Sequence, residues 1–228
     1  KNKNTRELAG YPLLAYAIGA AQEAGIFESV YVSTEDEATA NLALQFGASL
    51  CMRPRELAQD ATPDIEWVMD AMPCADPEEA FAIIRPTSPF RRGPWIRKAW
   101  EILQACPRAD SIRAVRPCLE HPAKMWRENL GKSGFLSPIM TGIGHEAPWH
   151  SMPTQLLPPV YTQTSALEIA WTRVLPGSIS GQMVLPYYTE AAAPESIDIN
   201  IEEDWWQAEA LAAEHPEYLP LVRRSDGG

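Results

Sequence analysis

One short segment combines a carboxylate with an amide at a spacing suited to metal chemistry. Asp198 and Asn200 occupy alternate positions of the segment 196–200, so in an extended strand their side chains share one face. A carboxylate and an amide oxygen side by side can hold a hard divalent cation that keeps several waters. Asn200 also fits the simpler role of N-cap for a helix that begins near Glu202. We expect a short strand at 196–200 that carries a metal site.

The segment 85–91, Arg-Pro-Thr-Ser-Pro-Phe-Arg, mixes cations with hydroxyls directly after an apolar stretch. Its two prolines restrict the backbone. The hydroxyls of Thr87 and Ser88, together with Arg85, suit an anionic or hydroxyl-rich ligand. A proline-stiffened turn with solvated arginines explains the same residues equally well.

Two further segments offer cations to a phosphate. Arg53 follows a predicted strand and is placed to reach a phosphate or a nucleoside, although Glu56 and Asp60 offer it ion pairs on a surface loop. Lys3 and Asn4 precede the first predicted helix. Each segment is a weak indication alone, and the two would form a phosphate site only if the fold brings them together.

Composition excludes several other classes of function. The net charge of −11 argues against a nucleic-acid partner, which needs a basic face. No apolar stretch approaches the roughly 20 residues of a membrane span, and no secretory signal is visible. The four cysteines lack C-x-x-C spacing and indicate buried thiols in a reducing compartment, so we expect a cytoplasmic protein; they are Cys51, Cys74, Cys106 and Cys118. The four histidines fit no single-helix metal site and indicate structural or surface roles; they are His121, His145, His150 and His215.

The elements that must position these residues alternate between strands and helices. Such alternation predicts βαβ units in an open, doubly wound, mostly parallel α/β sheet, where ligands bind beyond the carboxyl ends of the strands. The continuous apolar run at 80–84 is typical of a strand covered on both faces. We expect helices at 12–24, 35–46, 63–72, 94–105 and 202–213, and strands at 29–33, 48–52, 80–84, 110–116, 165–171 and 183–185.

The pattern changes between residues 117 and 160, which are rich in Pro, Gly, His and Trp. Their Trp and Met content is too high for a disordered linker. We interpret this segment, with a short strand at 124–127, as an excursion inserted into one domain that spans 1–228.

Taken in order, the motifs resemble the acylneuraminate cytidylyltransferase family, and the likeness extends over nearly the whole chain. One such motif is weak evidence, but six in the family's order are a strong joint signal. They are Lys3-Asn4 with 8–13; 32–37; Arg53-Pro54 with 56–58 and Asp60; 86–91; 120–122 with Lys124; and 196–200 with Glu203-Asp204.

The resemblance implies a Rossmann-like nucleotide-diphospho-sugar transferase fold. It implies an enzyme that forms a CMP-sugar and pyrophosphate from CTP and an acidic nonulosonic sugar of the sialic or legionaminic type, with Mg²⁺ as its cofactor. It also implies that the excursion forms a homodimer and lends residues to the neighbouring subunit's sugar site. The family's first strand and Gly/Ser-rich phosphate loop are expected before Lys1. The implied catalytic residues are Lys3 and Asp198; the nucleotide ligands Lys3, Asn4, Arg53 and Asp60; the sugar ligands Arg85, Thr87, Ser88, Lys124, Tyr161 and Gln163; and the metal ligands Asp198 and Asn200.

The chain departs from the family in the sugar half of the site. Arg85 replaces the common Gln and suggests an altered or more anionic sugar, Asn200 replaces a second Asp, and Thr164-Ser165 replaces the common Asn-Gly. Three alternatives stay open: a transferase for another nucleotide and sugar, such as GTP with a hexosamine phosphate; a metal-dependent glycosyltransferase; and a non-catalytic relative.

Overall fold

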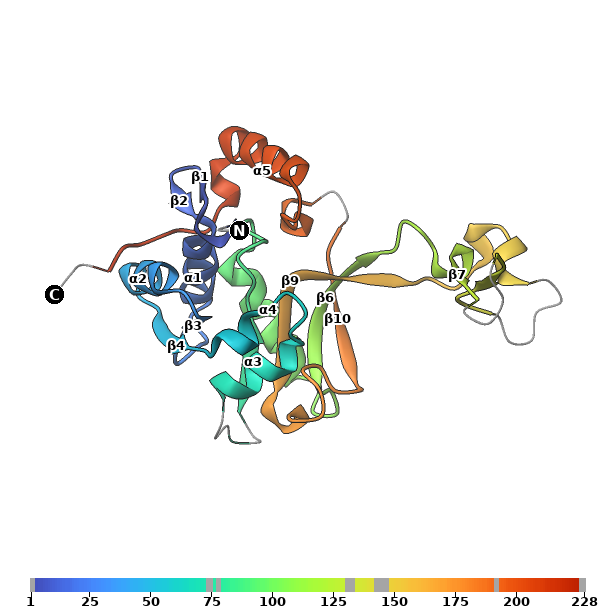
Figure 1. The fold of residues 1–228 in the computed structure, drawn as a ribbon, viewed down its shortest axis with the longest axis horizontal. Coiled ribbons are helices and arrows are strands. Elements are labelled where there is room, and N and C mark those ends of the chain that lie inside the picture. Colours follow the sequence, from blue (N-terminus) through green and yellow to red (C-terminus); the bar gives the residue numbers. More distant parts are fainter. Residues whose placement is uncertain are drawn as a thin grey trace. The chain divides into compact units, whose positions relative to one another are not determined.

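The computed structural model describes residues 3–72, 76, 79–129, 134–141, 148–190 and 193–225 (Figure 1). Every predicted site residue lies in these ranges, whereas Cys74 and His145 lie outside them. The helices are α1 (Leu13–Ala24), α2 (Glu37–Gln45), α3 (Asp64–Ala71), α4 (Gly93–Gln104) and α5 (Glu202–Glu214). The strands are β1 (Glu7–Leu8), β2 (Tyr11–Pro12), β3 (Tyr31–Thr34), β4 (Ser49–Met52), β5 (Ala80–Ile83), β6 (Ser111–Pro117), β7 (Trp126–Glu128), β8 (Leu136–Pro138), β9 (Tyr161–Trp171) and β10 (Val184–Tyr188).

The chain divides into two compact units. Residues 1–114 and 164–228 form the core unit, and residues 115–163 form the inserted unit between them. The predicted excursion, 117–160, begins two residues after the start of the inserted unit and ends three residues before its end.

The core unit contains a four-stranded sheet in the order β10-β6-β9-β5 and a separate parallel pair, β3-β4 (Figure 1). Strand β9 runs antiparallel to β5, with Phe81 opposite Ala170 and Ile83 opposite Glu168. The predicted Rossmann-like α/β fold is confirmed, but its four-stranded sheet is mixed because β9 returns from the insertion in the opposite direction to β5.

Strand β5 shows why the fold is doubly wound. Phe81 and Ile83 pack with Val68 of α3 in one apolar cluster. Ala82, which points to the opposite face, packs against a cluster built from α1, α4, β6 and β9. Because both faces of β5 are covered by helices, its sequence is continuously apolar rather than alternating.

Helices α1 and α4 lie close together over this second face. A Cβ atom on Gly93 would lie 2.5 Å from the backbone nitrogen of Ala24, so the contact requires a glycine at the start of α4. Gly25 ends α1 in the left-handed conformation, with φ 64°. The backbone N–H of Gly93 also donates to the Glu23 carboxylate, at 2.8 Å.

The inserted unit is held by a β7-β8 hairpin and by His121. The Nδ1 atom of His121 accepts from the backbone N–H of Ala123 at 3.1 Å, so Nε2 carries the proton and donates to the carbonyl of Pro158 at 2.9 Å. The interpretation of this histidine as structural is confirmed. The predicted strand at 124–127 starts two residues later, because Lys124 closes a 3-10 turn.

The strand predicted at 196–200 is wrong. Residues Pro194–Ser196 form a 3-10 turn, and no strand is assigned from 197 to 200. The backbone N–H of Ile199 donates to the carbonyl of Thr87, at 2.9 Å, instead of joining a ladder. Helix α5 starts at Glu202 as expected, but its N-cap is Ile201 rather than Asn200, and Asp204 accepts from the backbone N–H groups of Asn200 and Ile201.

Candidate functional site

Asp198 is the centre of a polar cluster in the core unit. Its Oδ2 atom accepts from Nδ2 of Asn200 at 3.0 Å. Its Oδ1 atom is buried and has no hydrogen-bond partner among the described residues. A buried carboxylate oxygen without a donor is costly unless a ligand or ion completes it, so this atom indicates a binding site.

Lys3 and the 85–91 loop are joined to the Asp198 segment from two directions. The Lys3 ammonium donates to the carbonyl of Ile199 at 2.6 Å, across 196 residues of sequence. Thr87 accepts from the N–H of the same residue. Since both bonds meet at Ile199, which is 1% exposed, the neighbouring Asp198 and Asn200 are held between Lys3 and the loop.

Arg91 supplies a second cation near Asp198. Its side chain is buried, and its Nη1 and Nη2 atoms donate to the carbonyl of Arg85 at 3.2 and 2.7 Å. Burial lowers the pKa of the Arg91 guanidinium to about 9; the Asp198 carboxylate opposes this shift and the Arg85 cation adds to it. The group stays cationic at neutral pH and places a fixed positive charge within electrostatic reach of the Asp198 carboxylate.

The donors at Asp198 fit a magnesium ion. No group of three or more His, Cys, Asp or Glu side chains suited to a metal occurs in the described part of the chain. Mg²⁺, however, needs only one or two protein carboxylates and takes its other ligands from water and substrate phosphates. The Asp198 Oδ1 atom, which has no hydrogen-bond partner among the described residues, meets that requirement. Asn200 bonds to Asp198 through its amide nitrogen, so its amide oxygen would have to turn toward the ion to serve as a second ligand.

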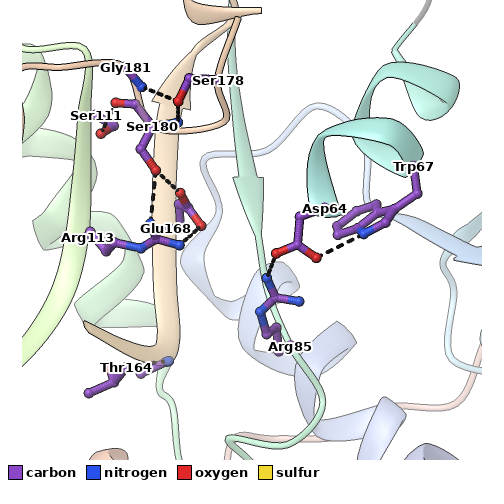
Figure 2. A network of polar contacts seen from close by, with 11 residues as sticks. Asp64, Trp67, Arg85, Ser111, Arg113, Thr164, Glu168, Ser178, Ser180 and Gly181 are labelled. Carbon is purple, nitrogen blue, oxygen red and sulfur yellow. Dashed lines mark hydrogen bonds and ion pairs between the residues drawn. The ribbon is translucent and has the colours of Figure 1, made fainter. Parts of the chain in front are cut away.

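Two predicted arginines follow strands and are each held by an acid. Arg53 follows β4 and pairs with Glu35 at 3.2 Å, not with Glu56 or Asp60. Arg85 follows β5 and pairs with Asp64 at the first turn of α3 (Figure 2). Both arginines are thus paired rather than simply solvated, and their roles as ligands stay predictions.

The remaining predicted residues have more varied surroundings. Ser88 is 2% exposed and shares a 2.9 Å hydrogen bond with Ser165, which makes it a structural residue of the loop. Asn4 and Asp60 are exposed. In the inserted unit, the Lys124 ammonium donates to the carbonyls of His150 and Met152. The predicted sugar ligands Tyr161 and Gln163 are exposed.

Comparison with known proteins identifies the family. The family model described as cytidylyltransferase matches residues 1–110. The CMP-N,N'-diacetyllegionaminic acid synthase of Legionella pneumophila is 30% identical over 229 residues, which cover 95% of this chain and 92% of that protein. The chain belongs to the acylneuraminate cytidylyltransferase family.

Other members of the family match part of the chain. The N-acylneuraminate cytidylyltransferase of Escherichia coli is 36% identical over 115 residues, which are 50% of this chain and 27% of that enzyme's length. The chain therefore spans about a quarter of the E. coli relative and nearly all of the Legionella one.

Solved structures share the family's fold at low sequence identity. A CMP:2-keto-3-deoxy-manno-octonic acid synthetase complexed with CTP has a TM-score of 0.64 at 11% identity, covering 93% of this chain and 92% of its own. A 4-diphosphocytidyl-2C-methyl-D-erythritol synthase from Anaerococcus prevotii has a TM-score of 0.63 at 9% identity, covering 92% and 93%. These matches establish the nucleotidyltransferase fold.

Three charged residues near the site were not predicted from the sequence: Arg91, Asp64 and Glu168. Arg91 was part of a recognised motif but was not assigned a role. Asp64 was missed because Asp at the start of a helix is ordinary. Glu168 was missed although a carboxylate inside the buried strand β9 was a usable signal.

Proposed function

We propose that this protein transfers the CMP group of CTP to a nonulosonic acid, using Mg²⁺. The carrying observation is the buried Oδ1 atom of Asp198, which has no hydrogen-bond partner in the described part of the chain and lies in a segment held by Lys3 and by the Thr87 loop. This cluster joins one carboxylate to two cations, which suits a metal–nucleotide complex. The names of the relatives support CTP and a nonulosonic acid as the substrates.

The reaction forms one bond and breaks one. The sugar hydroxyl oxygen attacks the α-phosphorus of CTP, the bond from that phosphorus to the bridging oxygen breaks, and pyrophosphate leaves with the electron pair. The hydroxyl proton passes to solvent. Bound Mg²⁺ would supply charge neutralisation for the phosphates.

The chain's own residues contribute positioning and charge. Asp198 and Asn200 would hold the metal, while Lys3, fixed near it by the Ile199 carbonyl, would contact a phosphate. The buried Arg91 adds a fixed positive charge within electrostatic reach of Asp198. Because these groups are preorganised, they stabilise the accumulating negative charge without rearrangement.

Arg53 and Asn4 are assigned to the nucleotide, together with Asp60. The Arg53 guanidinium is held by Glu35 and retains partial exposure, so its remaining N–H groups can reach the nucleoside. Thr87, Tyr161, Gln163 and Lys124 are assigned to the sugar, together with Arg85. We further propose a homodimer in which Lys124 serves the neighbouring subunit's site, and a cytoplasmic location where CTP is available.

No helix in the described ranges is long and apolar enough to cross a membrane.

The proposal is tested with full-length protein, Mg²⁺, each of the four nucleoside triphosphates, and N-acetylneuraminic or N,N'-diacetyllegionaminic acid. We expect pyrophosphate release with CTP and a nonulosonic acid, and a CMP-sugar in the mass spectrum. Release with GTP and a hexosamine phosphate would favour the alternative transferase. Turnover of a sugar nucleotide without pyrophosphate would favour a glycosyltransferase, and no turnover at all would favour a non-catalytic relative.

A further inference from the structure

The ion pair between Arg85 and Asp64 joins two elements that sequence reasoning treated separately. Arg85 follows β5, and Asp64 begins α3 (Figure 2). Their side chains are 33% and 34% exposed, so both reach solvent. Among the described residues, Asp64 is the only hydrogen-bond acceptor of the Arg85 guanidinium. The other N–H groups of this guanidinium stay open to a ligand.

Asp64 is itself held in place. Its Oδ1 atom accepts from the indole Nε1–H of Trp67 at 3.0 Å, and its Oδ2 atom accepts from Arg85. The two oxygens are therefore turned in fixed directions by α3 on one side and by Arg85 on the other (Figure 2). Asp64 can orient the guanidinium in the way that outer residues orient the groups that contact a ligand.

The charges around Arg85 are balanced. Arg113 pairs with Glu168 at 2.5 Å, and Glu168 also accepts from the hydroxyl of Ser180 (Figure 2). Burial raises the pKa of Glu168; Arg85 opposes that rise and Asp64 adds to it, so both lie within electrostatic reach. Arg91 also lies within electrostatic reach of Arg85 and of Asp198, so three cations stand against three carboxylates in this region and the local charge is close to zero.

This balance changes the interpretation of Arg85. A cation in place of Gln suggests a more anionic sugar, but an arginine already paired with Asp64 offers directed N–H donors without surplus charge. The adjacent carboxylate offers acceptor lone pairs. A sugar hydroxyl both donates and accepts, so it can bond to Asp64 and Arg85 at once.

We propose that Asp64 fixes the Arg85 guanidinium and that the two side chains together bind a neutral hydroxyl of the sugar. The inference rests on the proposed function, since it places the sugar beside the 85–91 loop. It makes the pair, rather than Arg85 alone, the element that sets sugar specificity. A site built to bond a hydroxyl rejects the analogue that lacks it, because its own polar groups are then left unpaired.

The test compares D64N, R85Q and the double variant with wild type. Sugar binding is measured by calorimetry with N-acetylneuraminic acid, N,N'-diacetyllegionaminic acid and their monodeoxy analogues, and KM for CTP is measured separately. We expect D64N and R85Q each to weaken sugar binding about tenfold, to leave the CTP KM within about twofold, and to lose discrimination against one deoxy analogue. The double variant should bind the sugar no more weakly than the single variant with the lower affinity, because the two residues act as a unit.

The control is E66Q, which removes an exposed carboxylate from the same helix and should bind sugar as wild type does. Asn at 64 keeps an oxygen for Trp67, and melting temperatures check that each variant is folded. Unchanged sugar binding in D64N, a rise in the CTP KM instead, or unaltered discrimination would each overturn the inference. Calorimetry needs no turnover, so it separates the two proposals. Sugar binding without pyrophosphate release would contradict the proposed function alone, whereas a wild-type protein that binds none of the sugars would overturn the inference.

Discussion

The core unit and the inserted unit hold their predicted site residues in different ways. In the core unit, Lys3, Thr87 and Asp198 are far apart in sequence and are drawn together by bonds that meet at Ile199. In the inserted unit, the Lys124 ammonium bonds only to carbonyls of residues in that unit, 26 and 28 residues away, among the described part of the chain.

This difference between the two units indicates which site residues a single chain can hold in place by itself. The Asp198 cluster is assembled by the core itself, because Ile199 is buried beside Phe90 and Trp205 in one apolar cluster. The inserted unit presents Tyr161 and Gln163 on its surface. We therefore expect the metal and nucleotide half to depend on residues of one chain, and part of the sugar half to depend on assembly.

The largest expected effect comes from removing the Asp198 carboxylate. D198A should lower kcat by about a thousandfold, since one preorganised charged group at a phosphoryl-transfer site is worth that much. Stability should fall by about 1–3 kcal/mol, because the buried Arg91 cation loses the carboxylate that offsets its burial. Pyrophosphate release and thermal melting measure the two effects. Substantial residual activity would contradict the metal assignment.

Replacing Lys124 tests the role of the inserted unit. K124A should lower kcat/KM for the sugar by about a hundredfold, the cost of an unpaired charge in a binding site. A 1:1 mixture of K124A and D198A chains that has been allowed to exchange subunits should recover about a quarter of wild-type activity if the site is shared in a dimer. Each mixed dimer then has one intact site. A mixture as inactive as its components would show that Lys124 does not act across an interface.

Asn200 tests how complete the core cluster is. N200D restores a second carboxylate beside Asp198, so it should lower the Mg²⁺ concentration for half-maximal activity by about three- to tenfold. The measurement is a Mg²⁺ titration of initial rate at saturating CTP. An unchanged midpoint would place Asn200 outside the metal's ligand set.

The smallest effect is expected away from the chemistry, at Tyr16 of α1. Its buried hydroxyl donates to the carbonyl of Leu8 at 2.6 Å, so Y16F should cost about 1 kcal/mol of unfolding free energy and leave activity unchanged. Burial raises the pKa of Tyr16 to about 12. The neutral phenol is favoured in the folded state, so its contribution is full below about pH 10 and is lost as pH rises towards 12. Urea unfolding at pH 8 and pH 11 should show this loss in wild type and less of it in Y16F.

Much of the core fold followed from the sequence. Helix α1 was predicted within one residue because Gly25 stops it and its apolar residues recur at helical spacing. Strand β5 followed from its continuous apolar run. The segment 196–200 was misassigned because its alternating pattern is satisfied by burying Ile197 and Ile199 under α5, without any partner strand.

The site was only partly predictable. Motif order selected Lys3 and Asp198, and Arg85 stood out as a departure from the family, but the sequence carries no sign that Asp64 is the partner of Arg85, 21 residues away. That pairing arises from the way α3 packs on β5 through Val68 and Phe81. Ion pairs across elements follow from packing, which local patterns do not specify.

The most direct test of the account is pyrophosphate release by full-length protein supplied with CTP, a nonulosonic acid and Mg²⁺. The account predicts release that needs all three components, appears as CMP-sugar, and is abolished in D198A. Release that persists in D198A, or that proceeds equally without Mg²⁺, would contradict it.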